Sequence, residues 1–193
     1  SRGLGDVYKR QIYNNGMGDK YLGNWMSSRG VQGEVIVIGK AAHTPHCEPK
    51  FIRPQIIESL ERLQTTKLDI FCLHRDNPEV PVSEFVDALT EVKNEGLIDL
   101  IGASNWEFHR FSEARDYASI SGRESFTVLS NNFSLAEMIE PVWPGCVGVT
   151  DQYLNYLIEE EVMLFPWSSQ ARGFFIKQKE VMSSDHFSNP NLD

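Results

Sequence analysis

The stretch Leu68–Pro78, LDIFCLHRDNP, decides the fold. Its first six residues are almost all apolar, and the polar run that follows begins with His74. A short apolar run bounded by polar and proline residues is typical of a strand that is buried on both faces. Runs of the same kind occur at Val35–Ile38, Leu100–Ala103, Phe126–Leu129 and Val162–Phe165. The sequence therefore predicts a series of buried strands.

Segments with helical periodicity separate these runs. Apolar residues recur every three or four positions in Pro54–Leu63, Val82–Val92, Phe108–Ala118 and Tyr153–Ile158. Gly96 stands where the second of these helices would end, and the acidic run Glu159–Glu161 is expected to be a solvated helix end. Strands and helices that alternate about every 30 residues predict βαβ units around a parallel sheet.

Polar residues follow each apolar run on its C-terminal side. They are Lys40, His74, Ser104 with Asn105, Ser130–Asn132 and Trp167–Gln170. In α/β barrels the C-terminal ends of the strands carry the ligand site, so we expect these residues to meet there. No glycine-rich phosphate loop follows the first run, which favours a barrel over an open doubly wound sheet. The predicted fold class is therefore α/β, a partial (β/α)8 TIM barrel with roughly five of its eight strands.

Composition argues against several classes of function. The 193 residues carry a net charge of −9, which disfavours a nucleic-acid or anionic-membrane partner. No apolar run approaches the roughly 18 residues that a membrane span needs. Three widely spaced cysteines do not suggest a disulfide framework. We therefore expect a cytoplasmic protein whose partner is a small molecule, neither nucleic acid nor membrane, and the oligomeric state stays open.

Five segments resemble the characteristic motifs of the aldo-keto reductases, in the family's order. They are IYNNGMGDKYLG (12–23), VIVIGKAAH (35–43), SLERLQTTKLDIFCLHRDNP (59–78), GLIDLIGASNW (96–106) and LFPWSSQARGFF (164–175). The first is similar to the family's tyrosine loop, in which a helical Leu-Gly pair follows the tyrosine. The motif sequences HRDNP, SNW and SSQARGFF are most similar to those of a bacterial branch of the family, whose members are sometimes fused to an inositol-dehydrogenase-like module.

The resemblance implies an oxidoreductase that uses NADPH or NADH to reduce an aldehyde, ketone or sugar-like carbonyl, or to run the reverse reaction. Hydride transfer leaves negative charge on the carbonyl oxygen, which needs a proton donor and electropositive neighbours. The resemblance assigns Tyr13 as the donor, Lys40 as the cation that tunes it, and His74 as the partner that orients the carbonyl oxygen. Taken alone, Tyr13 would be a surface or packing residue, Lys40 a solvated charge and His74 a structural histidine.

The resemblance also implies a set of cofactor-binding residues. Ser104 and Asn105 would hold the nicotinamide amide, and Trp167 would stack on its ring, although a turn and a core tryptophan are the alternatives. Ser130 stands where the family often has glutamine. The residues expected around the pyrophosphate are Ser168, Ser169, Gln170, Arg172 and Gly173.

The segment His43–Cys47, HTPHC, contains histidine and cysteine, which are zinc ligands in many proteins. A closed structural zinc site needs four ligands, and no clear fourth donor accompanies these three. Pro45 also stiffens the segment. We therefore expect a loop that faces the substrate, and no metal site.

Residues 1–11, SRGLGDVYKRQ, have neither an apolar period nor a helix cap. DVYKRQ matches the translation of a common transposase adapter, and Tyr8 stands where the family keeps an aspartate that pairs with the lysine. We therefore expect residues 1–11 to be non-native and to pack on nothing, with a natural N-terminal arm as the alternative. Residues 12–193 are expected to form an incomplete aldo-keto reductase barrel whose activity is in question without the missing parts.

Two other functional hypotheses stay open. The first is a nucleotide-sensing regulatory subunit that keeps the cofactor site but does not turn over. The second is that this chain binds nothing stably because half of its cofactor site is missing. Intact Tyr13, Lys40 and His74 favour the enzyme, and a cofactor titration would distinguish the three hypotheses.

Overall fold

A six-stranded parallel sheet forms the centre of the structure, a computed structural model that describes residues 7–8, 16–175 and 186–189. Its strands are β1 (Val7–Tyr8), β2 (Val37–Ala41), β3 (Leu68–Leu73), β4 (Ile98–Ala103), β5 (Val128–Leu129) and β7 (Met163–Leu164). Their order in the sheet is their order along the chain, and every neighbouring pair is parallel. This is the arrangement of consecutive βαβ units in a (β/α)8 barrel, and it confirms the predicted fold class.

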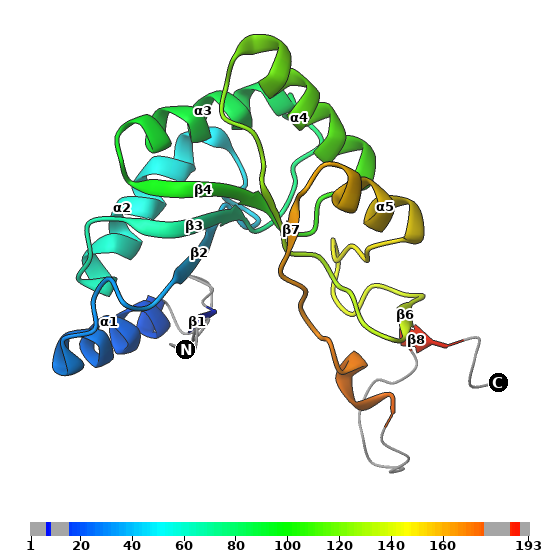
Figure 1. Ribbon diagram of the computed structural model, residues 1–193, viewed down its shortest axis with the longest axis horizontal. Coiled ribbons are helices and arrows are strands. Elements are labelled where there is room, and N and C mark those ends of the chain that lie inside the picture. The colour runs from blue at the N-terminus through cyan, green and yellow to red at the C-terminus, as the bar shows by residue number, and fades with distance from the viewer. Residues whose placement is uncertain (1–6, 9–15, 176–185, 190–193) are drawn as a thin grey trace.

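Helices cover the outer side of the curved sheet (Figure 1). They are α1 (Met17–Arg29), α2 (Ile52–Leu63), α3 (Val82–Asn94), α4 (Phe108–Ser121) and α5 (Asp151–Glu159). Two short 3₁₀ turns, η2 (Pro49–Phe51) and η3 (Ala171–Gly173), lie in loops. The strands β6 (Glu137–Met138) and β8 (Phe187–Ser188) form a separate antiparallel pair. The four helices expected from periodicity are confirmed. Helix α1 was indicated only by the resemblance, because its polar and apolar residues are poorly separated: Asp19 is buried while Tyr21 and Trp25 are exposed.

Strand β2 begins and ends later than the sequence suggested. The apolar run Val35–Ile38 predicted a strand that ends before Lys40, but β2 continues to Ala41. The reason is pairing with β3, since Lys40 lies opposite Cys72 and Ala41 opposite Leu73. The lysine therefore belongs to the strand rather than to the loop after it.

The expectation that residues 1–11 pack on nothing is wrong for Val7 and Tyr8. These two residues form β1 and pair with Val37 and Ile38 of β2. The edge of β2 offers backbone N–H and C=O groups that even a two-residue strand can use. The pairing does not test the origin of the segment, and the adapter interpretation stays a prediction.

Both faces of the sheet are buried, as the apolar runs indicated. On β3, Phe71 and Leu73 pack into the large core between sheet and helices, whereas Ile70 and Cys72 belong to a smaller cluster of buried residues. Trp106, which is fully buried, fills the centre of the large core between the rings of Phe85 and Phe126, with their centroids at 5.6 and 5.2 Å. The core thus fixes the loop that follows β4.

Close packing of the neighbouring strands explains why β4 has a glycine, Gly102, two residues before Ser104. A Cβ atom at this position would lie 2.6 Å from the Cys72 sulfur and 2.8 Å from the carbonyl oxygen of Val128. Only a residue without a side chain allows β3 and β5 to approach β4 this closely. The glycine therefore brings the ends of three strands together.

A nearly buried ion pair fastens the loop after β3 to helix α4. The Arg110 guanidinium donates to both carboxylate oxygens of Asp76, at 2.9 and 3.0 Å, and to the carbonyl oxygen of Val80 at 2.9 Å. The hydrogen bond with Asp76 raises the pKa of Arg110 above its ordinary value. The pair holds the segment that begins at His74 against the helix layer.

Breaking this pair should destabilise the fold. Arg110→Ala leaves the Asp76 carboxylate buried without its cation, so we expect the free energy of unfolding to fall by about 3 kcal/mol or more in urea denaturation. Arg123→Ala removes the partner of Asp87 at an exposed ion pair and is the matched control, with little change expected. Equal effects of the two substitutions would show that the Arg110 pair does not fasten the loop.

Candidate active site

The Lys40 ammonium lies at the C-terminal rim of the sheet and is 1% exposed. It donates to the hydroxyl oxygen of Ser104 at 3.0 Å and to that of Ser130 at 2.8 Å. The Ser104 hydroxyl in turn donates to the carbonyl oxygen of Ser130 at 2.6 Å. Side chains from β2 and from the ends of β4 and β5 thus form one cluster around a buried cation.

His74 stands at the same rim, directly after β3, and is 2% exposed. Its backbone N–H donates to Ala41 at the end of β2, over 2.7 Å. The rings of His43 and His74 pack edge to face, with the centroids 4.7 Å apart. The structure therefore brings the expected histidine to the lysine end of the sheet, whereas Tyr13 lies outside the described residues.

Asn131 holds the turn Ser104–Trp106 in place. Its side-chain oxygen accepts from the backbone N–H of Asn105 at 2.6 Å, and its side-chain nitrogen donates to the carbonyl oxygen of Trp106 at 2.9 Å. Asn105 needs this support because its backbone adopts φ 59°, in the left-handed region. The sequence placed Asn131 among the polar residues after a strand but could not assign it this role.

The side chains of Ser104 and Asn105 are largely engaged within the protein. The Asn105 amide nitrogen donates to the carbonyl oxygen of His74 at 3.3 Å and to the Ser104 hydroxyl at 3.0 Å, and its oxygen accepts from the Val147 N–H at 3.3 Å. Together with its bonds to Lys40 and Ser130, the Ser104 hydroxyl makes all three hydrogen bonds that it can form. A bound amide would have to replace some of these contacts.

Trp167 is 7% exposed and lies beside the end of β5. Its backbone N–H donates to Asn131 at 3.2 Å, and its carbonyl oxygen accepts from the side chain of Asn132 at 3.2 Å. In the part of the chain that the structure describes, its buried indole N–H has no hydrogen-bond acceptor. The tryptophan therefore offers a buried donor at the rim, a feature that it shares with Trp106 of the core.

The loop expected at the pyrophosphate has a strained backbone. Positive φ angles occur at Ser168 (56°), Ala171 (46°), Arg172 (52°) and Gly173 (88°). Turns of this kind can point backbone N–H groups at an anion. The N–H of Gly173 already donates to Gln170 within the loop, at 3.0 Å, and the Arg172 guanidinium lies 4.8 Å from the centre of the Trp143 ring.

The segment His43–Cys47 is a rim loop in the structure. His43 faces His74, and the Cys47 thiol donates to the carbonyl oxygen of Arg75 at 3.1 Å. Burial raises the pKa of Cys47 to about 12. Among the described residues, no group of three or more histidine, cysteine or acidic side chains could hold a metal ion.

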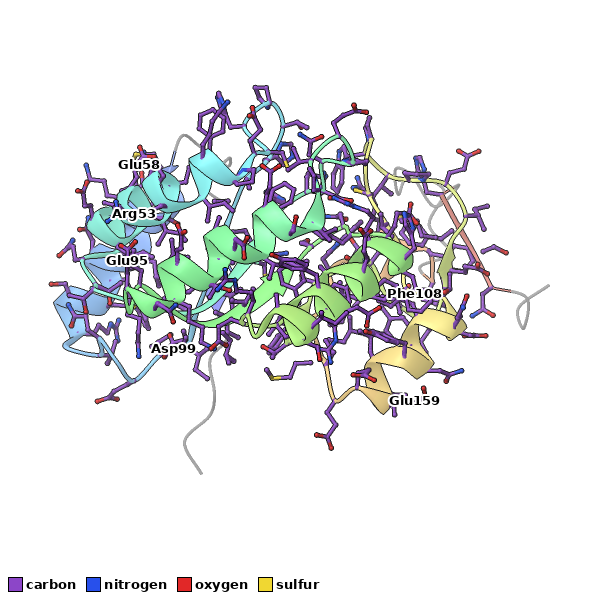
Figure 2. The ribbon with its side chains drawn as sticks, turned by 90° about the horizontal axis from the view of Figure 1, so that it is seen from above. Arg53, Glu58, Glu95, Asp99, Phe108 and Glu159 are labelled. Atoms are coloured by element: carbon purple, nitrogen blue, oxygen red, sulfur yellow. The ribbon has the colours of Figure 1, made fainter. Side chains whose placement is uncertain are left out.

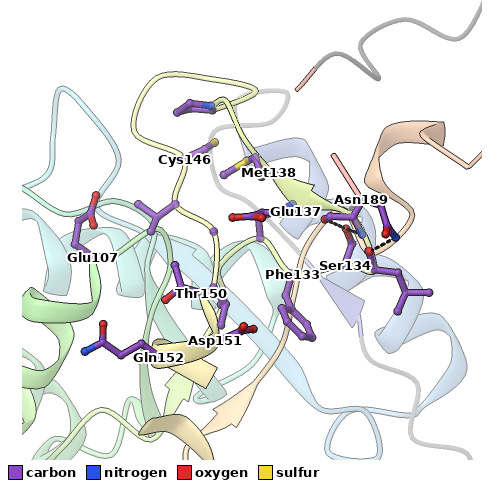
Figure 3. Close-up of a pocket in the computed structure, with 17 residues that line it drawn as sticks. Glu107, Phe133, Ser134, Glu137, Met138, Cys146, Thr150, Asp151, Gln152 and Asn189 are labelled. Atoms are coloured by element: carbon purple, nitrogen blue, oxygen red, sulfur yellow. Dashed lines mark hydrogen bonds between the residues drawn. The ribbon is translucent and has the colours of Figure 1, made fainter. Parts of the chain in front are cut away.

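A cavity of about 750 Å³ opens at the N-terminus of α5 (Figure 3). Glu107, Glu137 and Asp151 line it, together with residues of the loops that precede α5. Lys40, His74 and the predicted cofactor residues are not among its lining residues. Asn132, which the sequence placed among the polar residues after a strand, is the one expected rim residue that lines it, and its side chain donates to the carbonyl oxygen of Trp167.

The sequence profile of the Aldo/keto reductase family matches residues 6–186. The chain belongs to this family. An aldo-keto reductase of Fusarium vanettenii is 30% identical over 125 residues, which are 65% of this chain and 31% of that protein. The aryl-alcohol dehydrogenase [NADP(+)] of Phanerodontia chrysosporium is 22% identical over 180 residues, 84% of this chain and 44% of that protein.

Solved structures of two reductases share the fold. The Klebsiella pneumoniae aldo-keto reductase in complex with NADPH superposes with a TM-score of 0.73 at 20% identity, over 95% of this chain and 59% of that one. A putative 2,5-diketo-D-gluconic acid reductase B gives 0.71 at 21% identity, over 87% of this chain and 53% of that one. The family that the sequence motifs resembled is therefore confirmed, and the narrower placement in a bacterial branch stays a prediction.

The chain spans less than half the length of these curated relatives. None of the helices in the described residues could cross a membrane.

Asn131→Ala tests the support of the turn. The substitution leaves the Asn105 N–H and the Trp106 carbonyl buried without partners, so we expect a loss of about 2 kcal/mol or more in the free energy of unfolding. Asn94→Ala removes the same side chain from an exposed position of α3 and should change the free energy by less than about 0.5 kcal/mol. Equal effects in urea denaturation would contradict the role of Asn131.

Proposed function

We propose that the intact protein uses NADPH or NADH to reduce a small aldehyde, ketone or sugar-like carbonyl to the alcohol, or runs the reverse reaction. The observation that carries this proposal is the Lys40 ammonium, buried between the Ser104 and Ser130 hydroxyls at the same rim as His74. This lysine cluster occurs in a chain that belongs to the Aldo/keto reductase family, which supports the proposed reaction. Two similar proteins support the choice of cofactor. One is named aryl-alcohol dehydrogenase [NADP(+)], and the other, the Klebsiella pneumoniae aldo-keto reductase, was solved in complex with NADPH.

The residues at the rim fit a nicotinamide cofactor. The sign that supports this is position: Ser104 and Asn105 directly follow β4, and Trp167 forms a β-bridge with Asn132 just beyond β5, where its buried indole N–H would meet a polar group of a ligand. We assign Trp167, Ser104 and Asn105 to the nicotinamide end, and Ser168, Ser169, Gln170, Arg172 and Gly173 to the phosphates. In this assignment Ser130 serves the cofactor indirectly, because its hydroxyl holds Lys40. The bound nicotinamide would supply the hydride.

The protein side chains would handle the charge and the proton. A carbonyl oxygen that accepts hydride becomes negative, and an N–H of the His74 ring would orient it by hydrogen bonding. The Tyr13 hydroxyl would deliver the proton. A cation beside a phenol favours its ionised form, which makes the phenol a better acid, and Lys40 is held as that cation by two hydroxyl acceptors. We infer a cytoplasmic location and no nucleic-acid partner from composition alone.

Tyr13→Phe tests the acid. The change removes only the hydroxyl, so kcat for carbonyl-dependent NADPH oxidation in the intact protein should fall at least about 100-fold, while the cofactor Kd stays the same. Absorbance of NADPH gives the rate, and a fluorescence titration gives the affinity. Tyr21→Phe, at an exposed tyrosine of α1, is the control and should leave both quantities unchanged.

Two results would contradict the proposal. If Tyr13→Phe turns over at the wild-type rate, Tyr13 is not the acid. If the intact protein binds NADPH but no aldehyde or ketone that is tested makes it oxidise the cofactor, the regulatory-subunit hypothesis replaces the enzyme hypothesis.

A further inference from the structure

His43 lies against His74, the residue that the proposed reaction places at the carbonyl oxygen. The two rings pack edge to face, with their centroids 4.7 Å apart and their planes at 68°. His46 of the same loop is exposed, and its ring contacts a phenylalanine at the end of η2. His109 is exposed at the start of α4, directly after Phe108 on the helix side of the molecule (Figure 2). A ring contact with His74 therefore distinguishes His43 from these two histidines.

The loop His43–Cys47 is fastened at both ends. Before it, the backbone N–H of Ala42 donates to the side-chain oxygen of Gln55 on α2, at 2.8 Å. The bond supports a costly turn, because Ala42 has φ 55°, in the left-handed region. At the other end, the Cys47 thiol donates to the carbonyl oxygen of Arg75 at 3.1 Å. The loop is therefore bound both to α2 and to the residue that follows the neighbouring histidine.

The His43 ring is oriented by its own loop. Its Nδ1 lies 2.9 Å from the carbonyl oxygen of Thr44 and 3.1 Å from the Thr44 hydroxyl. A carbonyl oxygen can only accept a hydrogen bond, so Nδ1 carries the proton that this contact needs. The ring that packs against His74 thus has a defined direction of its own.

The plane of the His74 ring is the property that this contact controls. Rotation of a histidine ring about χ2 is broad and roughly twofold, so a fixed backbone does not by itself fix the ring plane. Aromatic pairs prefer edge-to-face geometry, which ties the plane of one ring to that of the other. Because a ring N–H lies in the ring plane, the contact also sets the direction in which His74 can donate a hydrogen bond.

We propose that His43 is a positioning residue, whose ring holds the His74 imidazole in the plane in which an N–H meets the carbonyl oxygen of the substrate. This proposal rests on the function proposed above, in which His74 orients that oxygen. His43 acts through the neighbouring ring and not through the substrate. His43→Phe should therefore keep most of the effect, since it retains a ring that can pack edge to face, whereas His43→Ala should lose it.

The first test is kinetic and uses benzaldehyde and NADPH with the intact protein. We expect His43→Ala to lower kcat about 10-fold with the NADPH Kd unchanged, because a misplaced group at the reacting oxygen slows the chemical step. His43→Phe should keep kcat within about 3-fold of the wild-type value. His46→Ala removes an exposed imidazole from the same loop and is the matched control, with kcat unchanged. If His43→Phe is as slow as His43→Ala, the ring contact does not position His74.

A double-mutant cycle shows whether His43 acts through His74. In a His74→Ala chain no ring is left to orient, so adding His43→Ala should change kcat less than about 2-fold. A further loss as large as in the wild-type chain would overturn the proposal, because His43 would then act on the substrate or on the fold. Thermal melting confirms that each variant is folded, and His43→Leu replaces His43→Ala if the latter is not.

Crystal structures of the intact variants separate this proposal from the proposed function. In His43→Ala the His74 ring should leave its wild-type plane or occupy more than one orientation, and in His43→Phe it should keep that plane, whether or not turnover occurs. An unchanged His74 plane in His43→Ala would overturn the role of His43. Absence of NADPH oxidation with benzaldehyde and with every other aldehyde or ketone tested would overturn the proposed reaction instead, and the His74 plane would still decide the role of His43.

Discussion

The buried ammonium of Lys40 is the constraint on which the site depends. A charge that is 1% exposed must find acceptors inside the protein, and the described acceptors are two hydroxyls from the ends of two other strands. Ser104 and Ser130 can reach it only if β2, β4 and β5 are in their observed register, which Gly102 permits by letting the neighbouring strands approach. Side chains from three strands are thereby tied to one cation.

The segment His74–Asn77 shows how one short loop serves several parts of the molecule. His74 faces the rim, and Arg75 lies under the loop that carries Cys146. Asp76 turns away to Arg110 on α4, and the Asn77 amide donates to the carbonyl oxygen of Cys47 at 3.0 Å. Successive side chains of a loop point in different directions, so the helix layer, the neighbouring loop and the site are fastened by adjacent residues.

The sequence predicted the strands and most helices because apolar periodicity reports burial directly. The run Leu68–Leu73 became β3 without change, since it is buried on both faces. The end of β2 was misplaced because pairing with β3, rather than hydropathy, carries that strand to Ala41. The β6–β8 pair joins residues about 50 positions apart and has no local signal. At the site, the polar residue types that follow the apolar runs predicted that Lys40, His74, Ser104 and Asn105 lie together at one rim of the sheet. The roles of Ser130 and Asn131 depend on where their side chains point, which one sequence does not contain.

A double-mutant cycle on Lys40 and Ser130 tests the central interaction most directly. Ser130→Ala is measured in the wild-type chain and in Lys40→Met, where a flexible apolar side chain replaces the ammonium, by urea denaturation. A hydrogen bond to a charged group contributes about 1.5–3 kcal/mol, so the substitution should cost about that much with the lysine and little without it. The predicted coupling free energy is therefore about 1.5 kcal/mol or more. A coupling near zero would show that the Ser130 hydroxyl does not hold the ammonium, and would contradict the account of the site.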